Sequence, residues 1–321
     1  MMIMTRCFLI LILFFVSGCI HIDLFPGGGQ LNEATLSGEG KDKVLLIDIS
    51  GMLTTGKSSG ILEEPSLPAR IKEELTKAEK DEHVKAIVLR INTPGGSVTA
   101  SDLVYHELKV FKKKRPVPVI AAIMDLGTSG GYYIAMAADH ILAHPSTITG
   151  SIGVIMVTMN AEGLLEKVGV KPSAIVSGPK KAMGSPFQPM NDEERAIFQG
   201  AIDHLYEQFL AVVEEGRPGL SKEHIRTLAD GRIFTADIAK AQGLVDDIGY
   251  LDEALDLAKK EAKLEKARVV TYTRGGGTHQ NIYSRFDPPQ IEPIRFPQVD
   301  AHSLFNVLTG GTPQMLYMWM P

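Results

Sequence analysis

Residues 84–96 read VKAIVLRINTPGG, and this stretch decides the fold. Val84–Ile91 is mostly apolar and β-branched and has the length of a buried strand. Asn92–Gly96 follows as a tight, glycine-containing loop, and Val98–Phe111 then has the apolar spacing of a helix. A strand, a short loop and a helix in this order are typical of a βαβ unit.

The same order recurs on both sides of this stretch. Val44–Ile49 and Val117–Ile123 are apolar runs of strand length, and residues 68–82 and 130–138 have helical spacing. We therefore expect an α/β fold with a mainly parallel sheet flanked by helices. Further short strands are expected at 141–143, 154–157, 174–176 and 269–272, and helices at 191–215, 222–229, 235–242 and 251–263, so the C-terminal part is mainly helical.

The composition bounds the classes of function. The chain has 321 residues, of which 44% are hydrophobic and 22% charged, as in an ordinary globular protein. A net charge of -5 gives no electrostatic argument for binding nucleic acid. The nine histidines are scattered, without an HExxH pattern or paired cysteines, so we expect no metal or other cofactor.

The N-terminus has the features of an export signal at residues 1–18. Arg6 precedes an apolar run at 7–16, which is too short to cross a bilayer because a spanning helix needs about 20 residues. The residues VSGC at 16–19 resemble the bacterial lipobox, in which Cys19 is acylated and becomes the first residue. Two alternatives remain open: a simple cleaved signal, or a start methionine placed upstream of a soluble protein.

The lipobox interpretation predicts an exported bacterial membrane lipoprotein that faces the periplasm or the extracellular side. Acyl chains on Cys19 would anchor it, because each buried methylene adds about 0.8 kcal/mol. Ile20, rather than an aspartate, follows the cysteine, which favours the outer membrane if the organism has two. We expect a flexible tether at 19–42, the main domain at 43–274 and an extended C-terminal tail at 275–321.

A glycine-flanked serine is the first candidate catalytic residue. Ser129 lies in GTSGG at 127–131, between an expected strand and an expected helix. Flanking glycines permit a strained turn that exposes a serine hydroxyl, and the Gly130 N–H can stabilise a developing oxyanion. The alternative is a serine that only caps the helix.

A second loop of the same kind lies at 93–97, TPGGS. In a parallel sheet both loops emerge at the carboxyl ends of the strands, where ligands usually bind. A Gly96 N–H directed into the site would supply a second oxyanion donor. The alternative is an ordinary turn between a strand and a helix.

A serine nucleophile needs a base, and two residue types are candidates. His140 and His144 are the nearest downstream histidines, but neither lies in a glycine-rich loop. Lys180 and Lys181 lie in SGPKKAMGSP at 177–186, where small and apolar residues surround them. A lysine acts as a base only when neutral, which burial favours; solvated surface lysines are the alternative.

Several motifs in order resemble the signal peptide peptidase A family of serine proteases, peptidase family S49. They are NTPGGS at 92–97, TSGGYYIAMAAD at 128–139, TGSIGV at 149–154, SGPKKAMGSP at 177–186 and DGRIFTADIAKAQGLVDDIGYLDEAL at 230–255. The resemblance implies a crotonase/Clp-protease-like fold and a Ser-Lys dyad with no cofactor. It implies peptide substrates such as remnant signal peptides, and a homo-oligomeric ring in which neighbouring protomers contribute the serine and the lysine.

Carried over motif by motif, the resemblance assigns five residues. Ser129 is the nucleophile, Lys181 the general base and Ser151 the residue that orients the lysine amine. Gly96 and Gly130 form the oxyanion hole. Lys180 is the adjacent, disfavoured lysine.

Some features depart from the family or leave alternatives open. Members of the family are usually anchored by a transmembrane helix, whereas this chain has the lipobox at Cys19. The tail ends in MLYMWM at 315–320, with the only tryptophan, and could pack on the body or a neighbour, enter the substrate groove or touch the membrane. The alternative functions are a Ser-His-Asp esterase that uses His279 and an inactive, peptide-binding lipoprotein scaffold.

Overall fold

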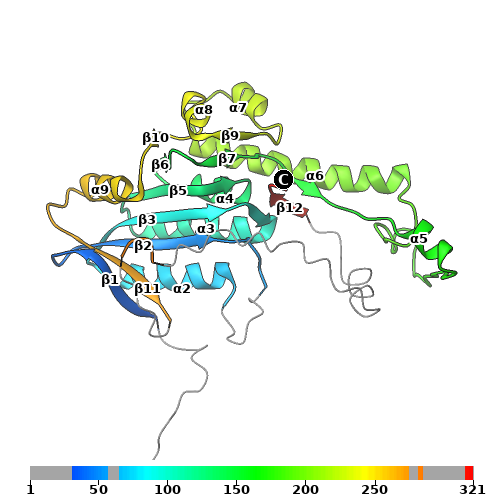
Figure 1. The fold of residues 1–321 in the computed structure, drawn as a ribbon, viewed down its shortest axis with the longest axis horizontal. Helices are drawn as coiled ribbons and strands as arrows, with labels where there is room; N and C mark the ends of the chain where they lie inside the picture. The colour runs from blue at the N-terminus through cyan, green and yellow to red at the C-terminus, as the bar shows by residue number, and fades with distance from the viewer. Residues whose placement is uncertain (1–30, 57–64, 275–280, 285–314, 321) are drawn as a thin grey trace, which may run out of the picture.

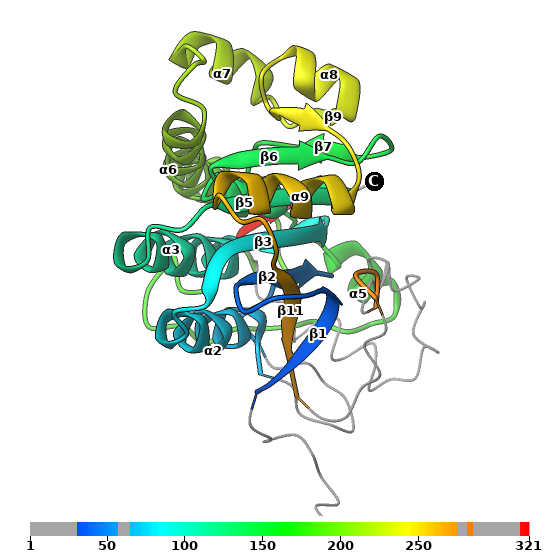
Figure 2. The same ribbon diagram turned by 90° about the vertical axis from the view of Figure 1, so that its left-hand side faces the viewer.

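A computed structural model describes residues 31–56, 65–274, 281–284 and 315–320 (Figure 1). It confirms the expected α/β architecture, with a mainly parallel sheet between helices (Figures 1 and 2). The export signal, Cys19 and His279 lie outside the described residues.

The main sheet has nine strands in the described part of the chain, and its central path runs β1-β11-β2-β3-β5-β6-β10. β1 pairs antiparallel with β11, and every other neighbouring pair on this path is parallel. The strands of this path are β1 Asn32–Gly38, β2 Lys43–Ser50, β3 Val84–Thr93, β5 Val119–Thr128, β6 His140–Ala143, β10 Asp247–Ile248 and β11 Arg268–Thr273. β5 also pairs along its second half with β7 (Ile148–Gly150), which pairs with β9 (Ile233–Thr235).

Helices cover both faces of this sheet, as Figure 2 shows. α2, α3, α4 and α6 contribute side chains to one hydrophobic cluster, and α9 contributes to the cluster on the opposite face. The helices are α2 Leu67–Lys80, α3 Val98–Lys114, α4 Gly130–Ala135, α5 Glu162–Lys167, α6 Asp192–Gly216, α7 Lys222–Leu228, α8 Ala236–Ala241 and α9 Leu251–Glu261. In the described part of the chain, none of them combines the length and apolar composition that crossing a bilayer requires.

A second, three-stranded sheet lies at the carboxyl end of the main strands. It consists of β4 (Gly95–Ser97), β12 (Met315–Met318) and β8 (Ile155–Met156), with β12 in the middle. β12 runs antiparallel to both neighbours. Met315–Met318 is therefore a strand inserted between two strands that lie far from it in the sequence.

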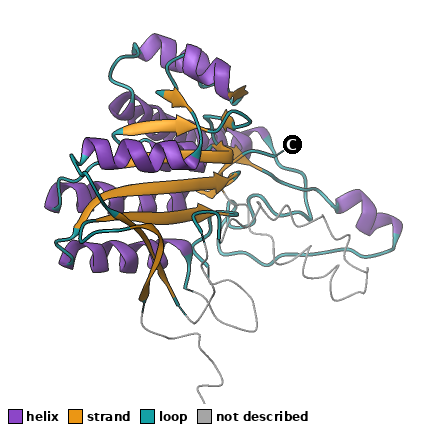
Figure 3. Ribbon diagram, turned by 60° about the vertical axis from the view of Figure 1, so that its left-hand side comes forward, coloured by secondary structure: helices purple, strands orange, loops and turns teal. Residues whose placement is uncertain are grey.

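An arm, defined here as residues 153–193, projects from the layered body and carries α5 at its far end (Figures 1 and 3). No residue of the arm is buried. The arm leaves the body through β8 and returns along α6, whose C-terminal half packs into the core through Phe209, Leu210 and Val213.

The structure corrects three sequence predictions. Residues 32–38, expected in the tether, form β1. This edge strand has only one buried residue, so its sequence, NEATLSG, is mostly polar and does not indicate a strand. Residues 174–176, expected as a strand, have no regular structure and lie exposed on the arm, where no strand is available to pair with them. Part of the expected extended tail, Met315–Met318, is a strand packed on the body, as one of the alternatives foresaw.

A buried arginine fastens another part of the tail. Arg90 on β3 is 1% exposed and forms an ion pair with Asp48 on β2. Its guanidinium also donates to the carbonyl oxygens of Ile282 and Ser284. A buried arginine needs such partners because an unpaired buried charge is costly, so residues 281–284 are held against the sheet.

The attachment of β1 includes a lysine at the start of β2. Lys43 Nζ donates to Glu33 Oε2 of β1 and to Asp81 Oδ2, both at 2.7 Å. Burial disfavours the ammonium ion, but the two carboxylates outweigh this and raise the pKa of Lys43. Burial likewise opposes the Asp81 carboxylate, and the hydrogen bond from Lys43 overcomes it and lowers the pKa of Asp81.

Replacing Lys43 with methionine should lower the free energy of unfolding by about 2 kcal/mol, because two partly buried carboxylates lose their donor. Stability from Lys43 is lost as the pH rises through its raised pKa, and that from Asp81 as the pH falls through its lowered pKa. At pH 7, between these two pKa values, both contributions to stability are present, and denaturant unfolding measures them together. Lys41→Met, at an exposed position, is the control; equal stability of the two variants would contradict the assignment.

Candidate active site

The site lies where β3 and β5 end side by side. Thr93 of β3 pairs with Gly127 of β5, after a register shift that follows Ile91. At this irregularity the Asn92 side chain accepts a hydrogen bond from Leu126 N at 3.0 Å. The two strands therefore stay together to their last residues, and the loops after them meet.

The conformation of the loop after β3 depends on its two glycines. Gly95 and Gly96 have φ values of 98° and 156°, which L side chains rarely adopt. Leu53 braces the loop on one side: its N–H donates to Gly95 O at 2.9 Å, and its carbonyl accepts from Ser97 N at 2.7 Å. A side chain at Gly96 would collide with Leu53, since a Cβ there would lie 2.2 Å from Leu53 O.

The loop after β5 places Ser129 in a strained conformation. Its φ of 52° and ψ of -112° are unusual for a residue with a side chain, and its N–H donates to Gly150 O at 2.7 Å. Although Ser129 precedes α4, its hydroxyl makes no capping hydrogen bond. The hydroxyl is buried and has no partner in the described structure, so helix capping does not explain this serine.

Strain is concentrated around this serine. Among the described residues, the non-glycine residues with positive φ are Ser129, Ser151 and Lys263. Ser151 follows β7, the strand that pairs with the end of β5, and is also nearly buried. Strained residues persist where the surrounding structure imposes them and cluster at functional sites.

The glycines of both loops surround the carbonyl oxygen of Tyr317 in β12. A Cβ on Gly95 would lie 2.0 Å from Tyr317 O and 2.9 Å from Gly130 N, and a Cβ on Gly130 would lie 3.2 Å from Tyr317 O. Tyr317 is opposite Gly96 in the antiparallel register, and two residues further Trp319 N donates to Pro94 O at 2.9 Å. Hydrogen-bonded positions alternate along such a pair, so the Gly96 N–H faces Tyr317 O.

We call Gly95, Gly96 and Gly130 the glycine cradle. It brings together the two residues that the sequence predicted as oxyanion donors, next to the predicted nucleophile. Close approach of another backbone is possible there only because no Cβ intervenes. Gly95 had no predicted role, and what marks it is its positive φ, which only the structure shows.

The side chain of Tyr317 is packed in the core. It is 1% exposed, its ring stacks on Tyr133 at 5.2 Å and lies 4.7 Å from the ring of Phe209. Its hydroxyl donates to Leu205 O at 2.8 Å. Burial, with a contribution from the nearby Asp102, raises the pKa of Tyr317, so the hydroxyl remains a donor. The apolar character of 315–320 was visible in the sequence, but its location was not.

The two candidate lysines lie on the arm, away from the glycine cradle. Lys180 Nζ forms an ion pair with Glu193 at 2.5 Å. Lys181 is exposed, and no described contact joins it to Ser129, whose hydroxyl has no partner. Within one chain the structure therefore does not bring Ser129 and Lys181 together.

The two candidate histidines have other partners. His140 Nε2 lies 3.1 Å from Asp247 Oδ2, and His144 Nδ1 lies 2.8 Å from Ser146 Oγ. Neither contacts Ser129. In the described residues, no three histidine, cysteine, aspartate or glutamate side chains are grouped so that they could hold a metal ion.

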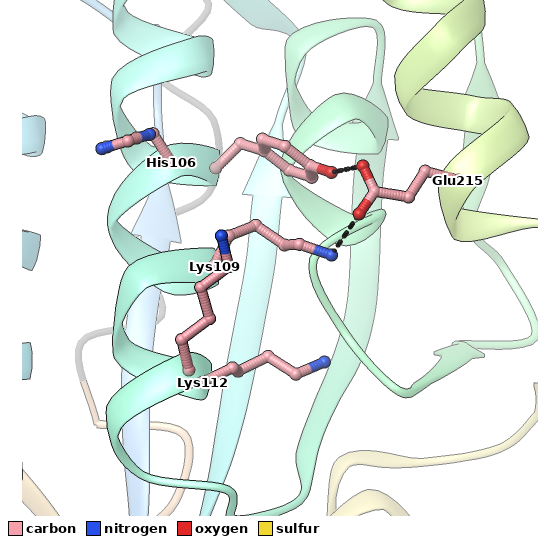
Figure 4. Close-up of a pocket in the computed structure, with 6 residues that line it drawn as sticks. His106, Lys109, Lys112 and Glu215 are labelled. Carbon is pink, nitrogen blue, oxygen red and sulfur yellow. Dashed lines mark hydrogen bonds and ion pairs between the residues drawn. The ribbon is translucent and has the colours of Figure 1, made fainter.

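A pocket of about 430 Å³ between α3 and α6 contains none of these residues (Figure 4). Tyr105 and Lys109 both donate to Glu215 at its edge, at 3.0 and 2.7 Å. These hydrogen bonds, first that from Lys109, lower the pKa of Glu215. The polar groups at this edge therefore satisfy one another, and the pocket is not part of the candidate site.

The comparisons with known proteins decide the family. A family model described as Peptidase family S49 matches residues 111–265, and one described as Clp protease matches residues 64–148. The chain is 37% identical over 251 residues to a candidate signal peptide peptidase SppA of Enterococcus faecium, covering 78% of this chain and 72% of that protein. The chain belongs to peptidase family S49. The family predicted from the sequence motifs is thereby confirmed.

A second sequence relative agrees with this assignment. A candidate protease of Methanocaldococcus jannaschii is 34% identical over 277 residues, covering 84% of this chain and 87% of that protein. Among solved structures, a ClpP1 variant of Listeria monocytogenes aligns with a TM-score of 0.43 and 20% identity, over 65% of this chain and 94% of that one. As a member of family S49, the chain is a serine protease with a Clp-protease-like α/β fold.

Replacing Gly95 with alanine should displace β12 from β4, because the new Cβ would lie 2.0 Å from Tyr317 O. The left-handed φ adds a strain of about 1–3 kcal/mol to the folded state. Quenching of Trp319, the only tryptophan, by acrylamide should therefore increase.

The matched control is Gly219→Ala, where a Cβ would meet nothing within 4 Å. It should leave the quenching of Trp319 unchanged. A folded Gly95→Ala chain with the quenching of the original chain would show that β12 does not lie on β4.

Proposed function

We propose that this chain is a membrane-tethered serine endopeptidase with a Ser129–Lys181 dyad that cleaves extended apolar peptides such as remnant signal peptides. The observation that carries the proposal is the position of β12. An extended apolar segment lies antiparallel to β4, with one carbonyl oxygen at the glycine cradle and next to Ser129. A groove that accepts this segment is suited to a peptide substrate bound as an added strand.

The chemistry is acyl transfer with balanced proton movements. The neutral amine of Lys181 takes the Ser129 proton while Oγ attacks the peptide carbonyl carbon. The N–H groups of Gly96 and Gly130 hold the oxyanion, and one such donor contributes about 2.7–4 kcal/mol. Lys181 then gives its proton to the leaving amine. A water molecule, deprotonated by the same amine, attacks the acyl-enzyme. The ammonium of Lys181 then returns that proton to Ser129 Oγ as the carboxylic acid leaves.

The separation of the two residues within one chain supports a site shared between copies. Half of the large hydrophobic side chains that the described structure leaves exposed lie between 155 and 176. They are Ile155, Val157, Met159, Leu164, Val168, Val170, Ile175 and Val176. Such a concentration is typical of a protein interface. We infer a homo-oligomeric ring in which the arm of one copy brings Lys181 to Ser129 of its neighbour.

Ser151 is proposed to orient the amine in that shared site. Its backbone N–H is already used, donating to Arg232 O at 2.8 Å, which fixes the residue after β7. The position next to the end of β5 allows its hydroxyl to act on an amine that approaches Ser129. The role stays a prediction.

The membrane tether is proposed from Cys19 and the lipobox alone. Acylation would place the peptidase next to the bilayer from which signal-peptide remnants must be cleared. Incorporation of labelled palmitate that is lost in Cys19→Ser tests this part separately from catalysis.

Ser129→Ala and Lys181→Ala should each lower kcat by at least about 10⁴-fold, because nucleophile and base act as a unit. Lys180→Ala should retain activity, since Lys180 is engaged with Glu193. The measurement is hydrolysis of an internally quenched apolar peptide, with far-ultraviolet circular dichroism as a check of folding. Loss of activity in Lys180→Ala rather than Lys181→Ala would shift the base by one residue.

The same assay separates the alternative functions. A Ser-His-Asp esterase would be inactivated by His279→Ala, which the proposal expects to be active. An inactive peptide-binding scaffold would leave Ser129 unlabelled by a fluorophosphonate probe.

Mixed oligomers test the shared site. Coexpressed Ser129→Ala and Lys181→Ala chains should recover activity, because random mixing gives about one quarter of the interfaces an intact serine and an intact lysine. Each variant alone is the control. If the mixture is as inactive as its components, serine and lysine come from the same chain.

A further inference from the structure

We infer that a strand bound in the groove between β4 and β8 fixes the arm to the body, so that occupancy of the groove positions the segment that carries Lys181. The catalytic consequence rests on the proposed function, whereas the mechanical coupling rests on the contacts of β12. A peptide substrate bound in the groove would then also help to position the base that acts on it.

The first contact is with the outgoing leg of the arm. β12 pairs with β8 through Met315 with Met156 and Leu316 with Ile155. β8 pairs with no other strand in the described structure. Because Tyr317 and Trp319 direct their backbone groups towards β4, the alternation of a strand directs those of Leu316 towards β8. The strand thus bridges the body and the arm with its two edges.

The second contact is with the core-packed half of α6, the helix that follows the arm. The Tyr317 hydroxyl donates to Leu205 O at 2.8 Å, and its ring lies 4.7 Å from that of Phe209. Both residues belong to α6, the helix along which the arm re-enters the body. On the body side the same ring stacks on Tyr133 of α4, whose hydroxyl is held by Asp102 at 2.9 Å. One side chain therefore joins α6 to α4.

In the part of the chain that the structure describes, little else holds the arm. No residue from 153 to 193 is buried, and α5 buries no side chain. Segments with few buried contacts open at low free energy. Strand pairing at β8, with a buried ring holding α6 next to the arm, should therefore change the opening of the arm strongly. By linkage, an arm that is held by a neighbouring copy should in turn favour binding of a strand.

The test is hydrogen–deuterium exchange of the arm in full-length chains that all carry Ser129→Ala, so that no peptide is consumed. Tyr317→Ala should displace β12 and so raise the exchange rates of residues 153–193 about tenfold, the factor expected when the one or two backbone hydrogen bonds between β12 and β8 are lost. Adding the peptide MLYMWMP, residues 315–321, should restore the slow rates. The peptide with alanine in place of its tyrosine should not.

Tyr283→Ala is the matched control, because Tyr283 is an exposed tyrosine of the same C-terminal region. It should leave the arm unchanged. Equal exchange of the arm in Tyr317→Ala and Tyr283→Ala would overturn the inference.

A second variant isolates the β8 contact. Ile155→Pro removes the N–H that faces Leu316 and should speed exchange of the arm while Trp319 keeps its quenching, because β12 stays on β4. Val157→Pro, beyond β8, is the control. Unchanged exchange in Ile155→Pro would exclude coupling through β8. Failure of the proposed function would appear separately, as a Ser129 that no fluorophosphonate labels in the unmodified chain.

Discussion

The pairing of β3 with β5 up to their last residues is the constraint on which the site depends. Thr93 against Gly127 brings two strand–loop–helix junctions to one point. One junction supplies backbone donors free of side chains, and the other supplies a serine in a strained conformation. The proposed oxyanion hole and nucleophile therefore depend on both junctions. The strain at Ser129, of order 1–3 kcal/mol, is sustained by the core beneath it.

The sequence predicted the parts of the fold that depend on local pattern. Val44–Ile49, Val84–Ile91 and Val117–Ile123 form central strands because both faces of such a sheet are buried, so their apolar runs are uninterrupted. β1 escaped prediction because an edge strand needs few apolar residues, and NEATLSG has few. The prediction of a strand at 174–176 was wrong because a short apolar run on an exposed arm has the same pattern as a short buried strand.

The site was predictable only in part, for a similar reason. Ser129, Gly96 and Gly130 follow from glycine-rich loops after strands, and the structure places them together. Tyr317 could not be placed, since its contact with Gly96 joins positions more than 200 residues apart and no periodicity encodes it. Lys181 poses the reverse problem. The motif names it, yet one chain leaves it exposed on an arm without buried residues, and only the proposed shared site would give it a partner.

The middle position of β12 also bears on aggregation. A strand edge with unpaired N–H and C=O groups is a template for aggregation. Without β12, the groove would present two such edges, β4 and β8. The C-terminal strand covers both, and Arg90 holds residues 281–284 of the same C-terminal region on the sheet. β12 thus protects the groove against self-association. A peptide that binds in the groove must displace β12.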